Sequence, residues 1–428
     1  MASSTTSPRV LLLSLVFSPD GVSTSVIMTE LAQELKALGH DITVLTTTPH
    51  YNEEPEGRAR QVLRPGFGGL IYTSELDGIR IYHARVPSKG RRVISRLFEY
   101  GWFHLASTLL GGTVARDFDI VLAPSPPLTI GVNAWMLARM RGVPFVYNVQ
   151  EIYPDVAVQL GVLRNRRLIS ALTRLERFIY DRSSRVVVIS EHFRRRLLAK
   201  GVPEEKLEVI PNFVDADFIH PRPQDNAFSR AHGLAGKFVV CYAGNLGLTQ
   251  DFESLLSAAE RLVGFPEVRF LIVGGGARRA WLEEELAARR LENVTLLDYQ
   301  PRSVVPDIYA TSGVCVIPMK PGTTQDTFPS KVYTIMAAGR PVIAAADADS
   351  ELAAVVETAR CGDVIEPGDV DGLVDAIRRA YEAREESAAR GERGRRFVEQ
   401  NHTRGVVARK YDRLIRDLIA GDERRRGA

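Results

Sequence analysis

The chain has 428 residues, more than one ordinary hydrophobic core accommodates, so its length favours two or three domains. Hydrophobic residues make up 45% and charged residues 25%, the balance of a soluble globular protein, and a net charge of +3 gives no global field that would attract nucleic acid. The three cysteines have no CxxC spacing, which argues against a disulfide framework or zinc site and favours a reduced, cytoplasmic protein.

The first half of the chain alternates short apolar runs with helical patterns. Its start imitates a signal peptide because Arg9 precedes an apolar run, but no small-residue cleavage site follows, so we predict a buried first strand. We expect helices over 22–38, 129–141 and 166–182. The predicted strands are 10–16, 42–46, 79–83, 120–123, 144–149, 186–189 and 207–210. Runs that are apolar on both faces are typical of parallel sheets covered by helices on each side.

The second half repeats this alternation after a proline-containing linker at 211–236. Its predicted strands are 238–243, 268–273, 294–298, 313–318, 341–345 and 364–366. We therefore predict an α/β protein with two Rossmann-like, doubly wound domains, at 1–215 and 216–403, that face a cleft between them. The remaining residues, 404–428, are predicted to form a helix over about 404–420, which could pack back across the hinge, and then a basic tail.

Ligands of open parallel sheets bind at the carboxyl ends of the strands. After the first strand, Gly21 precedes a helix and would let a backbone amide approach an anion, although a plain tight turn explains one glycine equally well. In the second half a strand runs into Gly274, Gly275 and Gly276, which favours backbone held close to a diphosphate or ribose, with simple turn chemistry as the even alternative.

The segment from Asp326 to Pro341 is the most informative. Ser330 is predicted to cap a helix that continues to residue 338, so that Lys331 and the first-turn amides would present positive potential to a diphosphate leaving group. Thr334 would lie one turn further along the same helix. An ordinary capped helix with an extended lysine remains the alternative.

Taken together, the runs YAGNLG, FLIVGGG, VTLLDYQP and PSKVYTIMAAGRPVIA resemble glycosyltransferase family 4, whose members are retaining enzymes of the GT-B fold. The resemblance extends from residue 10 to about residue 420. Within that family, the sequence is most similar to a bacterial branch that adds fucose-type or N-acetylfucosamine-type sugars during cell-surface polysaccharide assembly. It implies transfer of a sugar from a nucleotide-diphosphate donor to a polysaccharide or lipid-linked acceptor, with no cofactor or metal.

The resemblance also assigns residues, and this chain departs from it at three of them. The two family glutamates fall on Asp326, which would contact the transferred sugar, and on Thr334, which offers only a hydroxyl to the ribose. The family arginine and lysine that hold the diphosphate fall on Asn245 and Gln250, so both charges are missing here. We therefore expect Lys331 to carry most of the electrostatic stabilisation.

Four further residues follow predicted strands. Tyr299 and Pro301 would pack around the base and ribose, or else have a structural role at the sheet edge. In the N-terminal half, Glu151 would contact an acceptor hydroxyl and His50 would help to bind the acceptor, with helix capping or a surface position as the alternatives.

The stretch 89–110 joins a basic start to an aromatic, amphipathic segment. It fits a peripheral contact with the inner face of the membrane, where a lipid-linked acceptor would be reached, and it fits an internal helix equally well. Uninterrupted apolar runs long enough to span a bilayer are absent from the sequence.

Other functions remain open at this stage. A soluble small-molecule acceptor would keep the same chemistry, and a nucleotide-sugar epimerase would keep the same architecture. The missing GxGxxG argues against a nicotinamide oxidoreductase. A binding protein without activity would account for the two missing charges.

Overall fold

The computed structural model describes residues 7–50, 61–86, 93–113, 115, 117–159, 161–325 and 327–427. The chain divides into two compact units. The N-terminal unit consists of Met1–Pro154, Arg164–Asn212 and Arg404–Ala428, and the C-terminal unit consists of Asp155–Leu163 and Phe213–Thr403.

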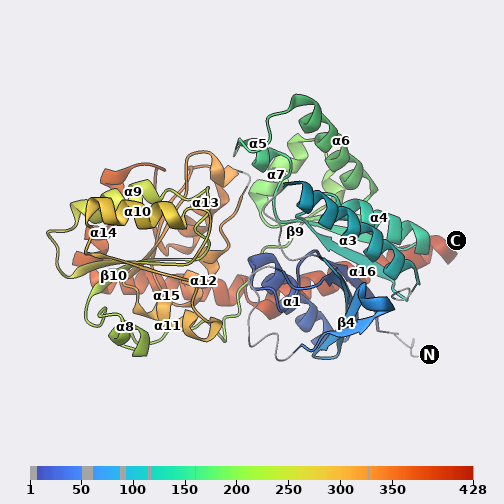
Figure 1. Cartoon of the computed structure of the whole chain (residues 1–428), viewed down its shortest axis with the longest axis horizontal. Helices are drawn as coiled ribbons and strands as arrows, with labels where there is room; N and C mark the ends of the chain where they lie inside the picture. The colour runs from blue at the N-terminus through green and yellow to red at the C-terminus, as the bar shows by residue number, and fades with distance from the viewer. Residues whose placement is uncertain are drawn as a thin grey trace. The chain divides into compact units, whose positions relative to one another are not determined.

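A nine-stranded sheet forms the centre of the N-terminal unit, in the order β3-β4-β5-β2-β1-β6-β7-β8-β9 (Figure 1). The strands are β1 (Arg9–Leu13), β2 (Asp41–Thr47), β3 (Arg64–Gly66), β4 (Ile71–Leu76), β5 (Ile79–Ala84), β6 (Ile120–Pro124), β7 (Phe145–Val149), β8 (Arg185–Val188) and β9 (Leu207–Val209). The pairs β3–β4 and β4–β5 are antiparallel and all the others are parallel. Strands β1 and β6 are buried almost throughout because helices cover both faces.

Helices on the two faces of this sheet come from distant parts of the chain (Figure 1). On one face lie α1 (Ser23–Ala37) and α16 (Arg404–Gly427), which pack together. On the other lie α3 (Val93–Thr113), α4 (Ile130–Arg141) and α6 (Arg166–Arg182). The short elements η1 (Phe67–Gly69), α7 (Glu191–Ala199) and η2 (Glu204–Lys206) connect the strands.

Polar contacts fasten the last helix to the first helix and to the turn that follows it. His40 Nε2 lies 2.7 Å from the Asp412 carboxylate, and Arg416 Nε donates to the same oxygen over 2.6 Å. Arg404 pairs with Glu34 of α1 at 3.1 Å. The helix that ends the chain is therefore part of the N-terminal unit.

The C-terminal unit has a six-stranded parallel sheet in the order β12-β11-β10-β13-β14-β15. The strands are β10 (Phe238–Ala243), β11 (Val268–Val273), β12 (Val294–Leu297), β13 (Val314–Pro318), β14 (Val342–Ala345) and β15 (Gly362–Ile365). Strands added in sequence run outward from β10 on one side and from β13 on the other, so the strand order reverses between these two.

Two hydrophobic cores lie on opposite faces of this sheet. One includes residues of α9 (Phe252–Arg261), α10 (Arg279–Arg289) and α14 (Val370–Glu382). The other includes residues of α8 (Ala227–Ala231), α11 (Val305–Thr311), α12 (Lys331–Ala337), α13 (Glu351–Ala359) and α15 (Arg384–Asn401). The unit also contains α5 (Asp155–Gln159), η3 (Arg302–Val304) and η4 (Thr323–Gln325).

The prediction of two α/β domains with parallel sheets is confirmed, and most predicted strands lie within a few residues of the observed ones. The antiparallel strands β3 and β4 were not predicted. Strand β3 is the three-residue run Arg-Pro-Gly, which carries no apolar signal. The predicted linker contains the short helix α8. The main segment of the C-terminal unit begins at Phe213, three residues before the predicted boundary, and the unit also takes Asp155–Leu163 from the predicted N-terminal domain. The predicted cleft stays a prediction.

Candidate functional site

Loops that follow β10 and β13 lie where the strand order of the C-terminal sheet reverses. In open α/β sheets this switch point, at the carboxyl ends of the strands, is where ligands bind. The loop 244–251 leads from β10 into α9, and the loop 319–330 leads from β13 into α12. Any site at this edge is therefore built from these two loops and from the glycine-rich loop after β11.

The glycine-rich loop packs tightly against the loop after β10. The amide of Gly244 donates to the carbonyl of Val273 over 2.9 Å, and the amide of Leu246 donates to the carbonyl of Gly275 over 2.9 Å. A Cβ on Gly274, whose φ is +147°, would lie only 1.9 Å from the Gly244 carbonyl oxygen. The glycine at 274 is thus explained by the approach of two loops, and the predicted contacts of Gly274 and Gly275 with a donor stay predictions.

Lys331 opens α12 and has an unusual environment. Its Nζ lies 3.7 Å from the centroid of the Tyr242 ring, is shielded from solvent, and has no hydrogen-bond partner among the described residues. A Cβ on Gly244 would lie 2.9 Å from the same nitrogen. Burial lowers the pKa of Lys331 from 10.5 to about 7. A buried ammonium without an anionic partner is costly, and an anion placed beside it would offset that cost.

The predicted cap of α12 is wrong. Ser330 precedes Lys331 but adopts helical backbone angles, with φ −56° and ψ −14°, and its side chain makes no capping hydrogen bond. The turn begins one residue earlier, because the amide of Val332 donates to the carbonyl of Pro329 over 3.1 Å. The helix has only seven residues, so the positive charge at this edge comes from Lys331 itself. Thr334 is half-buried on the next turn.

The residues that replace the two family cations lie in the loop after β10. Asn245 is exposed, and its carbonyl accepts a hydrogen bond from the Tyr242 hydroxyl over 2.5 Å. Gln250 is buried, its Oε1 accepts from the Gly247 amide over 2.9 Å, and its Nε2 lies 3.8 Å from the sulfur of Met319. Gln250 thus holds the two switch-point loops together, and contact of either residue with a donor stays a prediction.

Tyr299 and Pro301 follow β12. The Tyr299 ring is half exposed, at 49%, and would lie 3.1 Å from a Cβ placed on Gly275. Pro301 is exposed and precedes η3. Tyr299 is therefore available beside the glycine-rich loop to pack against a base or ribose. Asp326, the predicted sugar-binding carboxylate, lies outside the described residues.

The predicted acceptor residues lie in the N-terminal unit. The side chain of His50 is buried, with Nδ1 2.9 Å from the carbonyl oxygen of Thr48 and 4.0 Å from a carboxylate oxygen of Asp20. The His50 amide donates to the other Asp20 oxygen over 2.9 Å. Gly21 is half-buried two residues before α1. These contacts fix His50 and Asp20 against each other at the end of β2.

Glu151 lies two residues beyond β7 and is half-buried. Burial raises the pKa of this carboxyl group. The neighbouring Gln150 is held rigidly, because its amide nitrogen donates to Ser125 Oγ over 3.2 Å and its side chain bonds Asn148 and Asn212 over 2.9 and 2.8 Å. The chain that carries Glu151 is thus fixed by a polar network at the carboxyl edge of the sheet.

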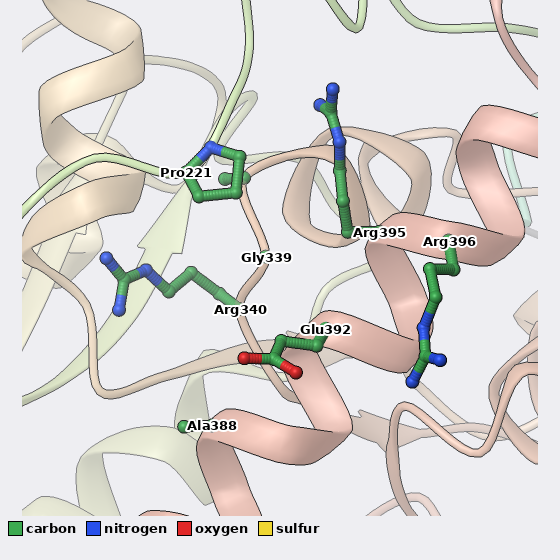
Figure 2. A pocket seen from close by; sticks show the side chains of 8 residues that line it. Pro221, Gly339, Arg340, Ala388, Glu392, Arg395 and Arg396 are labelled. Atoms are coloured by element: carbon green, nitrogen blue, oxygen red, sulfur yellow. The ribbon is translucent and has the colours of Figure 1, made fainter.

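A cavity of about 490 Å³ lies at the other end of α12 (Figure 2). Three guanidinium groups line it, but Figure 2 shows them pointing away from one another. Arg395 Nη1 donates to the carbonyls of Ala216, Ile219 and Ala337 over 2.8–2.9 Å. This cavity therefore lies beside a structural clamp between α15, α12 and the start of the unit.

Two features of the site were not predicted from the sequence. The packing of Lys331 on Tyr242 joins segments distant in the chain, and no local signal marks it. The contact of Asp347 with the loop after β13 likewise joins segments distant in the chain. Among the residues that the structure describes, no cluster of three or more potential metal ligands occurs.

Two family models match consecutive parts of the chain. Residues 21–212 match the Glycosyl transferase 4-like domain, and residues 224–397 match Glycosyl transferases group 1. The chain is a glycosyltransferase with a 4-like domain followed by a group 1 domain. The family models meet near the boundary between the two units of this glycosyltransferase, at Asn212 and Phe213.

Relatives of this glycosyltransferase span most of its length. It is 26% identical to the colanic acid biosynthesis glycosyl transferase WcaI of Escherichia coli (strain K12), over 87% of this chain and 92% of WcaI. It is 25% identical to the glycosyltransferase WbjE of Pseudomonas aeruginosa, over 72% of this chain and 76% of WbjE.

Solved structures share the fold of the glycosyltransferase, which is GT-B. Sucrose-phosphate synthase from Thermosynechococcus elongatus has a TM-score of 0.75 at 18% identity and covers 97% of this chain and 100% of its own. Anabaena HepE, solved in complex with UDP, has a TM-score of 0.72 at 16% identity and covers 96% and 100%. In the described part of the glycosyltransferase, none of the helices combines the length and apolar character needed to cross a bilayer.

Proposed function

We propose that this glycosyltransferase binds a nucleotide-diphosphate sugar at the switch point of the C-terminal sheet, with the diphosphate beside Lys331. The observation that carries the proposal is the buried Lys331 Nζ, which lies over the Tyr242 ring and has no hydrogen-bond partner among the described residues. Oxygen atoms of a diphosphate would supply the missing partners and counter-charge. The adjoining Gly244 leaves the nitrogen uncovered by a Cβ.

We propose transfer with retention at the anomeric carbon, on the basis of the family resemblance. As the bond from the sugar to the diphosphate breaks, negative charge grows on the leaving phosphate, and Lys331 stabilises it. The leaving phosphate takes the proton of the acceptor hydroxyl, so the C-terminal unit needs no separate base. Asp326 would hold the sugar hydroxyls, while Thr334 and Tyr299 would contact the ribose and base.

The acceptor binds in the N-terminal unit in this proposal. Glu151 would accept a hydrogen bond from the acceptor hydroxyl, and its fixed neighbour Gln150 keeps it in place. The name of WcaI, a colanic acid biosynthesis enzyme, supports a cell-surface polysaccharide or lipid-linked acceptor. The sugar that we propose is of the fucose or N-acetylfucosamine type, on the resemblance of the sequence motifs.

A donor and acceptor screen tests this function. Purified protein is incubated with UDP-, GDP- and dTDP-sugars together with either lipid-diphosphate sugars or soluble sugars, and products are identified by mass and by NMR of the anomeric proton. We expect transfer from one donor to the lipid-linked acceptor with retained configuration. Conversion of the donor when no acceptor is present would instead identify an epimerase, and transfer only to soluble sugars would identify a small-molecule enzyme.

We further propose that α3 and α4 rest on an anionic bilayer. Leu105 and Leu109 of α3 are 54% and 59% exposed, and Met136 and Met140 of α4 are 39% and 59% exposed. The two helices pack side by side (Figure 1), so the four side chains form a row of exposed apolar groups one turn apart on each helix. Part of the predicted membrane stretch, residues 89–92, lies outside the described residues.

The charge around this row favours an anionic lipid surface as its partner. Helix α4 has no acidic residue and exposes Arg139 and Arg141 beside Met140. The neighbouring α6 exposes five more arginines, which are Arg166, Arg167, Arg174, Arg177 and Arg182. Apolar side chains flanked by basic groups are typical of interfacial helices, and the surface would bring the N-terminal unit to a lipid-linked acceptor at the inner face of the membrane.

Vesicle sedimentation tests the membrane contact. We expect the protein to bind vesicles that contain anionic phosphatidylglycerol and not vesicles of phosphatidylcholine alone. The double variant Leu109→Ser, Met140→Ser should lose this binding, whereas Val263→Ser, at a similarly exposed valine of the C-terminal unit, should retain it. Equal sedimentation of all three proteins, or equal binding to both kinds of vesicle, would refute the contact.

A further inference from the structure

The loop between β13 and α12 is fastened on one side to the loop after β10. The amide of Lys320 donates to the Thr249 carbonyl over 2.9 Å, and Thr323 Oγ1 donates to the Lys320 carbonyl over 2.7 Å. The amide of Asp251 donates to the carbonyl of Pro318 over 2.7 Å. These bonds hold the start of the loop, and they come from the two strands that flank the switch point.

Asp347, two residues beyond β14, holds the same loop from the other side. One oxygen of its carboxylate accepts from the Gly322 amide over 3.0 Å, and the other accepts from the Thr324 hydroxyl. The hydroxyl oxygen of Thr324 in turn accepts from the Asp347 amide over 3.3 Å. Thr324 is 2% exposed, so water cannot replace the bonds between Thr324 and Asp347 without a change in the loop.

The fastened part of the loop continues towards Lys331. Thr327 Oγ1 donates to the Thr323 carbonyl over 2.5 Å, and the rings of Phe328 and Tyr333 lie 5.4 Å apart. Tyr333 is buried on α12, two residues after Lys331. A displacement of the loop at Thr324 would therefore be transmitted to the start of α12.

We propose that Asp347 is a positioning residue of the donor site, acting through Thr324. This role requires no contact with the diphosphate, because Asp347 holds the loop whose far end leads to Lys331 over Tyr242. A carboxylate suits this position because it accepts from an N–H and an O–H at the same time. Alanine at 347 removes both acceptors, and valine at 324 removes the hydroxyl while keeping the size of the side chain. The inference rests on the proposed function of this site.

Steady-state kinetics with varied donor concentration test the inference. We expect Asp347→Ala and Thr324→Val each to lower kcat/KM for the donor by about tenfold, because a misplacement of the order of 1 Å at a reacting group costs this much or more. The double variant should be no more than about threefold worse than either single variant, because both remove the same contact. Thr324→Ser, which keeps the hydroxyl, should restore kcat/KM to within about threefold of the parent protein.

The controls separate positioning from general destabilisation. Asp375→Asn, at an exposed carboxylate of α14, should leave kcat/KM unchanged. The milder Asp347→Asn covers the case in which Asp347→Ala fails to fold. Relative to the parent protein, its ligand-free melting temperature should change less than the rise in melting temperature that saturating nucleotide diphosphate produces.

The inference is overturned if the two single variants keep kcat/KM within about twofold of the parent, or if their effects multiply in the double variant. If Lys331→Met loses transfer while both Asp347 variants remain active, positioning fails and the proposed function stands. If the parent protein neither transfers sugar from any donor nor binds any nucleotide diphosphate, the proposed function fails, and the positioning role fails with it.

Discussion

Replacement of Lys331 by methionine should make the ligand-free glycosyltransferase more stable while it abolishes donor binding. Methionine keeps an unbranched side chain of similar length and removes the buried charge. Because burial lowers the pKa of Lys331 from 10.5 to about 7, the charged form is disfavoured in the folded protein. A buried lysine without a partner lowers the stability of the ligand-free protein. Such a cost is typical of a residue whose role is to bind an anion.

The magnitude follows from the two pKa values. At pH 6 the lysine is charged in both the folded and unfolded states, and a depression of 3.5 units (10.5 − 7) corresponds to about 5 kcal/mol of lost stability at 1.36 kcal/mol per unit. The variant also loses the contact between the ammonium group and the Tyr242 ring, which contributes about 1–2 kcal/mol of stability to the parent protein. We therefore expect Lys331→Met to raise the free energy of unfolding by about 3–4 kcal/mol at pH 6, the difference between these two terms.

The sign of the pH dependence is a second test. Between the folded pKa and the unfolded pKa the unfolded chain binds more protons, so the parent protein gains stability as the pH rises through this window. At pH 9 the remaining cost is about 2 kcal/mol (1.5 units), and the advantage of the variant should shrink by about 2–3 kcal/mol relative to pH 6.

Urea and thermal unfolding of the ligand-free full-length proteins at pH 6 and pH 9 measure both quantities. The control is Lys320→Met, which removes a lysine at the start of the loop after β13 and should show no comparable gain. The reasoning is refuted if Lys331→Met is less stable than the parent at pH 6, or if the difference between them does not depend on pH.

Three other changes have defined outcomes. Gly274→Ala should fold poorly and lose at least about 3 kcal/mol of stability, measured by soluble yield and urea unfolding, because its Cβ would meet the Gly244 carbonyl at 1.9 Å; normal stability would contradict the loop packing. Burial alone would raise the pKa of Asp412, but its hydrogen bonds to Arg416 and His40 outweigh burial and lower this pKa. Asp412→Ala should therefore lower the free energy of unfolding by about 1–3 kcal/mol at pH 7. The loss should become progressively smaller below about pH 4, where the carboxylate of the parent protein is protonated. Glu151→Gln should lower kcat by more than about tenfold and remove the acid limb of the pH–rate profile. Because burial raises the pKa of Glu151, this limb should lie at a higher pH than the pKa of an ordinary carboxylate. An unchanged acid limb in the variant would exclude the proposed role of Glu151.

The alternation of apolar runs and helical patterns was sufficient to predict the architecture. Buried parallel strands such as β10 and β13 are apolar on both faces and bounded by glycine or proline, so their positions follow from local sequence. Short or polar elements such as β3 and α8 carry no such signal. Their positions are set by contacts with distant segments.

The site was predictable only in part. Lys331 could be selected because it begins a helix after a strand at the switch point, but its contact with Tyr242 depends on how β10 and α12 pack, which no local pattern records. The cap by Ser330 failed because the turn begins at Pro329, which leaves Ser330 in helical geometry. The predicted approach of Gly274 to a diphosphate or ribose stays a prediction, and the structure explains this glycine by the nearby Gly244 carbonyl.

Calorimetric titration of nucleoside diphosphates provides the most direct test of the central claim, that Lys331 awaits a diphosphate. UDP, GDP and dTDP are titrated at pH 8 into the parent protein and Lys331→Met, in two buffers with different ionisation enthalpies. The account predicts that one nucleotide binds the parent with uptake of nearly one proton, because the anion raises the pKa of Lys331 from about 7, and that Lys331→Met neither binds comparably nor takes up a proton. Equal binding by both proteins, or binding without proton uptake, would contradict it.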